Sequence, residues 1–318
     1  MTRTLGRSGL EASRLGLGLA AVGRPAYINV GHNTDLGPDR SVEALRDRAE
    51  SLLDTAFSLG LRYFDAARSY GRAEEFLASW LRSRGLAPGA VTVGSKWGYV
   101  YTGEWRVDAE RHEVKQLSAD TLRRQLDETR SLLGDHLSLY QIHSATLESG
   151  VLDDQAVLAE LAALRASGLA VGLTVTGPRQ AETAAHAVDV GVFDAIQATW
   201  NLLERSAAAT LERAHAAGMG VIVKEALANG RLTARHGPRR LLVVARELGA
   251  TPDALALAAA RAHPWADVVL SGAATQSQLV SNVRAEQITY GEDADARLTQ
   301  LVEDPDAYWG RRSRLPWR

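Results

Sequence analysis

The chain of 318 residues contains no cysteine, which excludes disulfide bonds and catalysis by a thiolate. Its formal net charge of -2 provides no excess of positive charge that would favour a nucleic acid or an anionic membrane as partner. Long hydrophobic runs are missing too, because the longest, residues 253–262, is short and interrupted by Arg261. Charges scattered through residues 1–20 argue against a signal peptide. We therefore expect a cytoplasmic protein without nucleic-acid or membrane partners.

Clustered metal ligands are also missing from the sequence. The eight histidines form no His-x-His pair and no helical His-x-x-x-His pattern with a glutamate. His136 and His143 are seven positions apart and cannot make a metal site alone. We therefore expect no metal centre, and a metal-dependent hydrolase is disfavoured.

What the sequence does contain, from about residue 44 onward, is a regular alternation of helical and strand-like segments. Eight strand-like segments lie at 14–20, 61–66, 91–96, 136–143, 169–176, 193–200, 219–225 and 266–272. This pattern predicts the α/β class and a (β/α)8 TIM barrel. We expect one domain over residues 1–318 with an N-terminal cap. Long substrate loops at about 20–42 and 97–117 are predicted on the C-terminal face, with a tail, 303–318, over the barrel.

A doubly wound sheet is the alternative α/β architecture, and it would need a glycine-rich turn leading directly into a helix. Residues 16–25, GLGLAAVGRP, contain the glycines, but a polar stretch intervenes before helical periodicity begins. That stretch is long for a connection, so we interpret it as a functional loop, with disorder as the alternative. Its Tyr27, Asn29 and His32 are candidate substrate contacts.

Four ionisable side chains follow three of the predicted strands: Asp65, Tyr70, Lys96 and His143. Strand ends meet at one face of a parallel barrel, so we expect these side chains to gather there, although each alone could be an unrelated surface residue. Reduction of a carbonyl needs a proton for the emerging alkoxide and a donor at its oxygen. Tyr70 can supply the proton if the neighbouring Lys96, held by Asp65, lowers its pKa. His143 can orient the carbonyl oxygen.

At these residues the chain resembles the aldo-keto reductase superfamily, over nearly its whole length. Residues 63–77, YFDAARSYGRAEEFL, resemble the family's aspartate-to-tyrosine segment, while GSKWG at 94–98 and LYQIH at 139–143 resemble its lysine and histidine segments. The resemblance implies an NAD(P)H-dependent enzyme that transfers a hydride to an aldehyde or ketone, or catalyses the reverse oxidation. It implies that Tyr70 is the general acid and that Lys96, Asp65 and His143 complete the catalytic set.

The resemblance also implies a set of cofactor contacts, namely Thr176, Gln197, Lys224, Leu227, Gly230, Gly272, Thr275, Gln278 and Asn282. A loop that runs into a helix N-terminus suits a phosphate, because free amides and the helix dipole favour an anion there. We expect NADP(H) rather than NAD(H). Two departures from the family weaken particular contacts: Gly177 replaces an asparagine, and Ala274 stands where many members have an arginine, which Arg284 would replace only if it turned inward.

Lys224 is a third departure, because the family commonly has a tyrosine there that stacks on the nicotinamide. A cation over the ring would disfavour the oxidised cofactor by Coulomb repulsion. The side chain could instead point toward a phosphate or the substrate, or pair with Glu225.

Aromatic residues are concentrated in the predicted loops and tail. The expected substrate contacts are Tyr27, Trp97, Tyr99, Trp105 and Trp309, with packing of the loops on the barrel as the alternative for some. The expected partner is a small carbonyl or alcohol, and the oligomeric state is open. Two other functions remain alternatives: a nicotinamide-binding regulatory or interaction subunit, and an isomerase or dehydratase with internal redox chemistry on the same barrel.

Overall fold

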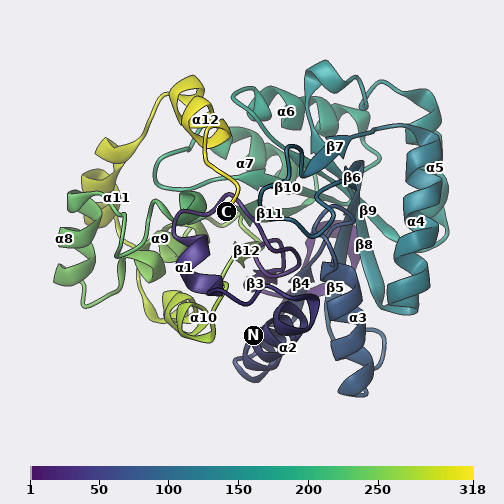
Figure 1. Ribbon diagram of the computed structural model, residues 1–318. Coiled ribbons are helices and arrows are strands. Elements are labelled where there is room, and N and C mark those ends of the chain that lie inside the picture. The colour runs from purple at the N-terminus through teal and green to yellow at the C-terminus, as the bar shows by residue number, and fades with distance from the viewer. Residues whose placement is uncertain (1) are drawn as a thin grey trace.

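The computed structural model describes residues 2–318, and its centre is a closed barrel of eight parallel strands (Figure 1). The strands are β3 (Leu15–Gly18), β4 (Tyr63–Asp65), β5 (Thr92–Trp97), β8 (Leu137–Ala145), β9 (Ala170–Val175), β10 (Ala195–Thr199), β11 (Gly220–Lys224) and β12 (Val268–Ser271). Pairing of Val269 with Leu15 closes the sheet. The predicted (β/α)8 barrel is confirmed, and each strand overlaps one of the eight predicted segments.

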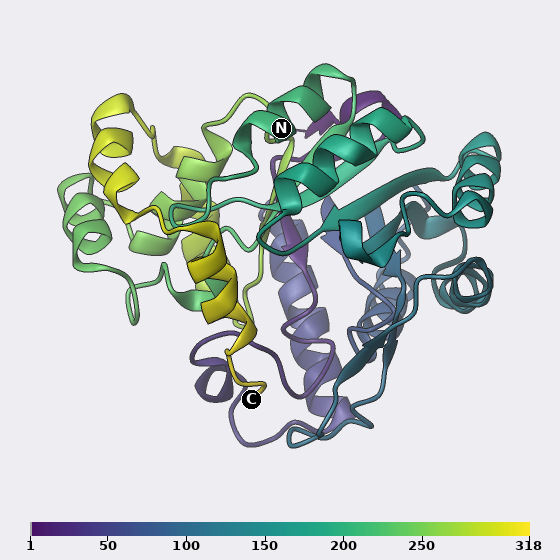
Figure 2. The ribbon, with the colours of Figure 1, turned by 90° about the horizontal axis from the view of Figure 1, so that it is seen from above.

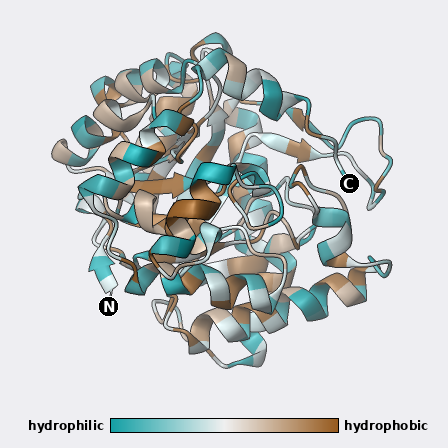
Figure 3. Cartoon of the chain, turned by 90° about the vertical axis from the view of Figure 1, so that its left-hand side faces the viewer, coloured by the Kyte–Doolittle hydropathy of each residue, from teal (hydrophilic) through white to brown (hydrophobic). Residues whose placement is uncertain are grey.

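Helices surround the barrel (Figure 1). They are α2 (Val42–Ser58), α3 (Ala73–Ser83), α4 (Ala119–Leu133), α5 (Gln155–Ala166), α6 (Gln180–Val190), α7 (Ala208–Ala216), α8 (Arg239–Glu247), α9 (Pro252–Arg261), α10 (Gln276–Val283), α11 (Glu292–Leu298) and α12 (Pro305–Ser313). Capping side chains fix several starts: Ser41 accepts from the Ala44 N–H, and Ser118 from the Thr121 N–H. Along the helices hydrophobic and hydrophilic residues alternate, as expected of helices with one packed face (Figure 3).

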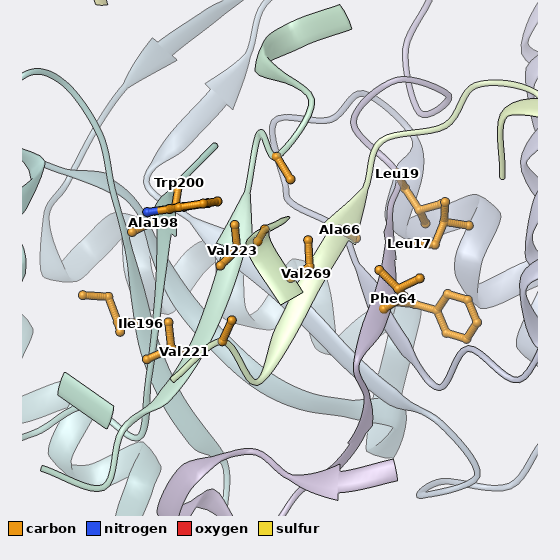
Figure 4. Close-up of a cluster of buried hydrophobic side chains, with 14 of the residues drawn as sticks. Leu17, Leu19, Phe64, Ala66, Ile196, Ala198, Trp200, Val221, Val223 and Val269 are labelled. Atoms are coloured by element: carbon orange, nitrogen blue, oxygen red, sulfur yellow. The ribbon is translucent and has the colours of Figure 1, made fainter. Parts of the chain in front are cut away.

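Alternation along the strands divides the buried side chains between two cores. One set points outward and packs under the helices, including Leu17, Phe64, Ile196, Val221 and Val269 (Figure 4). The other set fills the inside of the barrel, and its members are Leu5, Ala12, Tyr63, Leu139, Ala170, Ala195, Ile222, Val268 and Leu270. The barrel is therefore a packed core and not a pore.

The inward positions change from apolar to polar toward the carboxyl ends of the strands. Tyr63 is followed two residues later by Asp65, and Ile222 by Lys224, so that each pair shares the inward face. Tyr63 crosses the interior, and a Cβ atom at Gly94 would lie 2.6 Å from its hydroxyl oxygen. Glycine is therefore required at position 94. Asp65 and Lys224 therefore lie toward the mouth of the barrel.

The two ends of the barrel are covered by different segments (Figure 2). An antiparallel hairpin of β1 (Thr2–Thr4) and β2 (Glu11–Ser13) lies at the amino-terminal end of the strands, where Leu5 and Ala12 join the interior core. A second hairpin, β6 (Tyr99–Tyr101) and β7 (Glu113–Lys115), forms much of the 97–117 loop at the opposite end. Sequence analysis did not predict these two hairpins.

The inserted segment 20–42 and the C-terminal tail meet at the mouth of the barrel. The segment contains the short helix α1 (His32–Leu36). Tyr27 and Arg318 exchange two backbone hydrogen bonds of 3.1 and 3.3 Å, which places the end of the tail beside this segment. In Figure 1 the C-terminus accordingly lies beside the labels of β11 and β12, at the left-hand side of the barrel. Within residues 2–318, no helix has both the length and the apolar character needed to cross a bilayer.

Candidate active site

A cavity of about 580 Å³ opens at the carboxyl ends of the strands, within the size range of small-molecule sites. Asp65, Tyr70 and His143 line it, and Lys96, which is 1% exposed, lies directly behind Asp65. The structure thus brings together the four side chains that the sequence predicts to be catalytic. They come from β4, the turn after it, β5 and β8.

Lys96 and Asp65 form a buried ion pair against the ring of Tyr70. The Lys96 Nζ atom donates to Asp65 Oδ2 and, at 2.9 Å, to the carbonyl oxygen of Ala66. The other oxygen, Asp65 Oδ1, accepts from Gln197 Nε2 at 3.1 Å. Both charges are removed from water, so each depends on the other for stability. Lys96 Nζ lies 4.9 Å from the centroid of the Tyr70 ring, which places the ammonium beside the phenol.

The turn that carries Tyr70 is held by direct backbone contact with the turn after β3. The Arg72 N–H donates to the Gly23 carbonyl oxygen at 2.7 Å. A Cβ atom at Gly23 would lie 2.3 Å from the carbonyl oxygen of Tyr70, and one at Gly71 would lie 2.5 Å from that of Gly23. Gly71 also has a φ of +62°, which favours glycine. The two glycines therefore fix where the phenol lies.

Tyr70 is a protonated phenol at neutral pH. Burial raises its pKa well above the ordinary value, and the negative charge of Asp65 adds to the rise. The cation that acts most strongly in the opposite direction is Arg24, which the sequence analysis did not assign to this role. A phenol that retains its proton suits a proton donor, because it releases the proton only to a strong base such as an alkoxide.

His143 is a neutral imidazole beside the phenol. Its ring centroid lies 5.4 Å from that of Tyr70 and 5.0 Å from that of Tyr99, both in edge-on geometry. Its Nδ1 atom lies 3.4 Å from Ser69 Oγ. Burial lowers the pKa of His143 well below its ordinary value, and nearby cations, Lys96 first, lower it further. A neutral imidazole has one N–H, which can orient a carbonyl oxygen.

Arg24 is a site residue that sequence analysis missed. It lines the cavity at 2% exposure, and its NH1 atom donates to the Ser69 carbonyl oxygen at 2.9 Å and to Glu113 Oε2 at 2.8 Å. Its Cζ atom lies 5.3 Å from the Tyr70 ring centroid and 4.5 Å from that of Trp317. Arg24 therefore connects four segments that are remote in sequence. No local pattern marks such a residue, although an arginine directly before a proline in a predicted functional loop is a weak signal.

Lys224 extends from the end of β11 into the cavity wall, where its Nζ atom donates to Thr199 Oγ1 at 3.0 Å. It forms no ion pair with its neighbour Glu225. That carboxylate accepts instead from Arg312 of α12, whose Nε atom lies 3.0 and 3.1 Å from the two oxygens. Burial lowers the pKa of Lys224 to about 8. Of the alternatives for Lys224, pairing with Glu225 is the one that the structure does not contain.

Another part of the cavity is lined by the loop after β12 and by one side of α10. Thr275 Oγ1 accepts from the Gln278 N–H at 3.2 Å, and Gln278 Oε1 accepts from the Ala274 N–H at 2.9 Å. Lining residues include the predicted cofactor contacts Thr176, Gln197, Lys224, Leu227, Gly230, Gly272, Gln278 and Asn282. Thr275, the remaining predicted contact, caps α10 and is not itself part of the lining.

The sequence analysis considered Arg284 as the basic side chain for this part of the cavity, but the structure places other arginines there. Arg284 is exposed and does not line the cavity. Arg235 does, and it pairs with Asp35 of α1 at 2.9 Å. Arg48 NH1 donates to the Ala274 carbonyl oxygen at 3.5 Å. Arg48 and Arg235 are therefore the cations available near the loop after β12.

The predicted substrate contacts fall into two groups. Tyr27 and Tyr99 line the cavity, as do Asn29 and His32 of the inserted segment. Trp97, Trp105 and Trp309 do not. Trp97 is fully buried, the Trp105 indole donates to the Arg40 carbonyl oxygen at 2.8 Å, and Trp309 packs beside Lys224 and Arg312. These three rings pack the loops and tail on the barrel. Aromatic character alone could not distinguish the two roles.

Comparison with known proteins identifies the family of this chain. The model of the aldo/keto reductase family matches residues 15–303. The chain belongs to this family. It is accordingly an oxidoreductase, in a family that uses nicotinamide cofactors and acts on small carbonyl compounds. The resemblance predicted from the sequence is confirmed.

Several relatives have oxidoreductase names. An uncharacterized oxidoreductase of Bacillus subtilis (strain 168) is 25% identical over 344 residues, covering 96% of this chain and 98% of that protein. A second one from the same organism is 28% identical and covers 47% of this chain and 40% of that protein. Pyridoxal 4-dehydrogenase of Microbacterium luteolum is 29% identical, with 44% and 42% covered. This chain thus matches less than half of the last two proteins.

Solved aldo-keto reductases have the same fold. A putative aldo-keto reductase from Pseudomonas aeruginosa is 26% identical, with a TM-score of 0.66 over 93% of this chain and 95% of that chain. The holo form of an aldo-keto reductase from Bacillus halodurans gives a TM-score of 0.72 at 21% identity, with 95% and 96% covered. At that identity the second likeness bears on the fold alone.

Proposed function

We propose that this aldo/keto reductase reduces an aldehyde or ketone with NAD(P)H and Tyr70 as the proton donor, and catalyses the reverse oxidation of the alcohol. The observation that carries the proposal is the buried Lys96–Asp65 pair against the Tyr70 ring, with the neutral His143 beside it at one cavity. Each of these groups matches a requirement of carbonyl reduction.

The cavity suits a nicotinamide dinucleotide. The loop after β12, with Gly272 and the start of α10, would hold the phosphates. A Cβ atom at Gly272 would have nothing within 4 Å, and the amide groups at a helix N-terminus favour an anion. Thr176 and Gln197 would face the nicotinamide end. Arg48 and Arg235 favour NADP(H) over NAD(H), since either guanidinium could pair with an additional phosphate. A bound reduced cofactor would supply the hydride that carbonyl reduction needs.

The chain's own residues orient the substrate and supply the proton. His143 donates a hydrogen bond to the carbonyl oxygen and holds it near Tyr70. The Tyr70 hydroxyl transfers its proton to that oxygen as the alkoxide forms, which leaves a phenolate. Lys96 and Arg24, whose charges lie 4.9 and 5.3 Å from the ring centroid, stabilise this phenolate. Asp65 holds the Lys96 ammonium in place, and the reverse steps oxidise an alcohol.

The test is titration of the purified protein with NADPH and NADH, followed by turnover of aromatic and sugar-like carbonyl compounds. Pyridoxal belongs in the panel because one relative is named for it. We expect binding, with tighter binding of NADPH, and turnover that falls by about 10² to 10⁴-fold in Tyr70→Phe while cofactor binding is retained. Binding without turnover of any carbonyl would contradict the reductase proposal, and so would full activity of the Tyr70→Phe variant.

A further inference from the structure

Lysine is rare in this chain, and its lysines surround one site. The sequence contains only Lys96, Lys115 and Lys224, so the remaining 33 of its 36 basic residues are arginines. All three ammonium groups lie close enough to His143 to lower the pKa of that imidazole. All three lysines thus lie around His143, as does one arginine, Arg24.

Most cations at the cavity have a carboxylate partner. The pairs are Arg24–Glu113, Lys96–Asp65, Arg235–Asp35 and Arg312–Glu225. Lys224 also lines the cavity, yet within residues 2–318 no carboxylate forms a salt bridge with it. The hydrogen-bond partner of its Nζ atom is the neutral hydroxyl of Thr199. Within residues 2–318, Lys224 thus has no salt-bridge partner at the wall of the cavity, although the charges of Glu225 and Asp65 act on it from a greater distance.

The position of Lys224 in the barrel directs this charge to the reacting groups. Lys224 is the register partner of Thr199 on β10, and it follows the inward-facing Ile222 by two residues. Its side chain therefore belongs to the inward set at the mouth. Its charge also contributes to the lowered pKa of His143, which would contact the carbonyl oxygen. An anion paired with Lys224 would lie beside the reacting carbonyl.

A partly buried ammonium without a counter-charge is unfavourable, because burial removes hydration that no carboxylate replaces. Burial accordingly lowers the pKa of Lys224 to about 8. An anionic group on a ligand would supply the missing partner and raise that pKa again. The charge of the neighbouring Glu225 already raises this pKa in part, but Glu225 forms its ion pair with Arg312, which donates to both of its oxygens.

We propose that the substrate is a carbonyl compound that carries a carboxylate, and that Lys224 pairs with this carboxylate. The inference rests on the proposed reductase function of the same site. A monoanion suits the site better than a dianionic phosphate, because one ammonium faces it while Glu113 and Glu225 line the same cavity. Lys224 would then select the substrate, whereas Lys96 supports the proton donor.

Paired substrates of equal size test the selectivity. The kcat/KM for 4-formylbenzoate is compared with that for 4-formylbenzamide, which lacks the charge. We expect the wild-type enzyme to favour the carboxylate by about tenfold to a hundredfold, the range of a charge-assisted hydrogen bond. In Lys224→Met and Lys224→Gln this ratio falls to about one, with the largest change in KM. The matched control is Lys115→Met, which removes a cation near His143 that does not line the cavity, and its ratio stays high.

A second measurement needs no turnover and no variant. The whole chain is labelled with lysine carrying ¹³C at Cε, and NMR then resolves three side-chain signals whose pH titration gives each pKa. We expect benzoate to raise the Lys224 pKa by about one unit or more, and benzamide to leave it unchanged. The charged groups around Lys224 are Glu225, Arg312, Lys96 and Asp65, and none of them is altered in this comparison.

The outcomes separate this inference from the proposed function. A substrate ratio near one in the wild type, or no rise of the Lys224 pKa with benzoate, overturns the inference while leaving carbonyl reduction intact. A second result would also overturn the inference. If NADPH alone raises the Lys224 pKa, and Lys224→Met weakens NADPH binding without changing the substrate ratio, Lys224 contacts a cofactor phosphate. If no carbonyl is reduced but benzoate raises the pKa, the proposed function fails and the carboxylate site stands.

Discussion

Arg312 in α12 and Glu225 at the end of β11 are 87 positions apart, and the arginine Nε atom donates to both carboxylate oxygens, at 3.0 and 3.1 Å. The Arg312 guanidinium also lies 5.5 Å from the centroid of the Trp309 ring. The pair attaches the tail to a barrel strand next to Lys224. It therefore couples the position of the tail to the wall of the active-site cavity.

Arg312→Met should destabilise the fold, because it leaves the Glu225 carboxylate largely buried without its partner. We expect a loss of about 1–3 kcal/mol in the free energy of unfolding, measured by urea denaturation. Arg311→Met is the control, since Arg311 is exposed and pairs with Glu303 at 3.0 Å on the surface; there the loss should be at most about 1 kcal/mol. Equal losses in the two variants would show that the Arg312–Glu225 pair is no stronger than a surface pair.

The same pair should make stability depend on acidic pH. Burial alone would raise the pKa of Glu225, but the charges of Arg312 and Lys224, with the hydrogen bonds from Arg312, together hold the pKa below the ordinary value. A carboxylate whose pKa is lower in the folded than in the unfolded state stabilises the fold above the unfolded-state pKa, at about 4.3, and loses this contribution as the pH falls. Urea denaturation should show a gap between wild type and Glu225→Gln at pH 7 that narrows below about pH 4. A gap that widens in acid would contradict this sign.

Lys96→Met should be far more harmful than the loss of a surface charge, because Lys96 is buried. It leaves Asp65 charged and buried, which costs about 3–5 kcal/mol when one partner of a buried pair is removed. Adding Asp65→Asn should restore part of this stability but not the turnover, because the phenolate of Tyr70 would still lack its ammonium. Thermal unfolding and single-turnover hydride transfer measure the two effects separately. Full recovery of turnover in the double variant would remove Lys96 from the mechanism.

Gly23→Ala should move the proton donor without touching it. The new methyl group would lie 2.3 Å from the Tyr70 carbonyl oxygen, so the turn that carries Tyr70 has to shift. We expect kcat to fall by at least about tenfold and the fold to lose about 1–3 kcal/mol through overpacking. Gly291→Ala is the control, since nothing lies within 4 Å of the added atom. An unchanged kcat in Gly23→Ala would show that the turn accommodates the methyl group without displacing Tyr70.

The pH profile of kcat/KM should depend on the substrate's charge. Burial lowers the pKa of Lys224 to about 8, so above that pH the free enzyme loses the cation that would hold a carboxylate. The kcat/KM for 4-formylbenzoate should therefore fall above about pH 8, while that for 4-formylbenzamide should not. No limb near pH 6.5 should arise from His143, because burial and then Lys96 lower its pKa well below the ordinary value. If kcat/KM fell equally for both substrates above pH 8, the fall could not be assigned to Lys224.

The barrel and the four catalytic residues could be predicted from the sequence, because both depend on local patterns that recur along the chain in a fixed order. Strand-like runs that end at Asp65, Lys96 and His143 also end at one face of a parallel barrel. Arg24 and Arg312 were inaccessible as site residues because their partners, Glu113 and Glu225, lie 89 and 87 positions away. Such contacts are set by how the loops fold over the mouth, and no spacing rule encodes them.

The pKa of the proton donor shows a second limit of sequence reasoning. The sequence could predict that Lys96, at the end of one strand, and Tyr70, in the turn after the neighbouring strand, lie close together. It could not predict whether burial or charge dominates the pKa of Tyr70. Burial, followed by Asp65, determines the direction of the shift for Tyr70. Cofactor preference and cellular location stay predictions, as do the roles proposed for the cavity residues.

The two chain ends lie at opposite ends of the barrel (Figure 2). Leu5, in the turn of the N-terminal hairpin, is packed into the interior core, whereas Arg318 is paired with Tyr27 at the rim of the cavity. An affinity sequence or surface tether joined ahead of the hairpin would therefore leave the entrance clear. The same addition after Arg318 would begin at the entrance, and it would compete with any ligand that has to pass there.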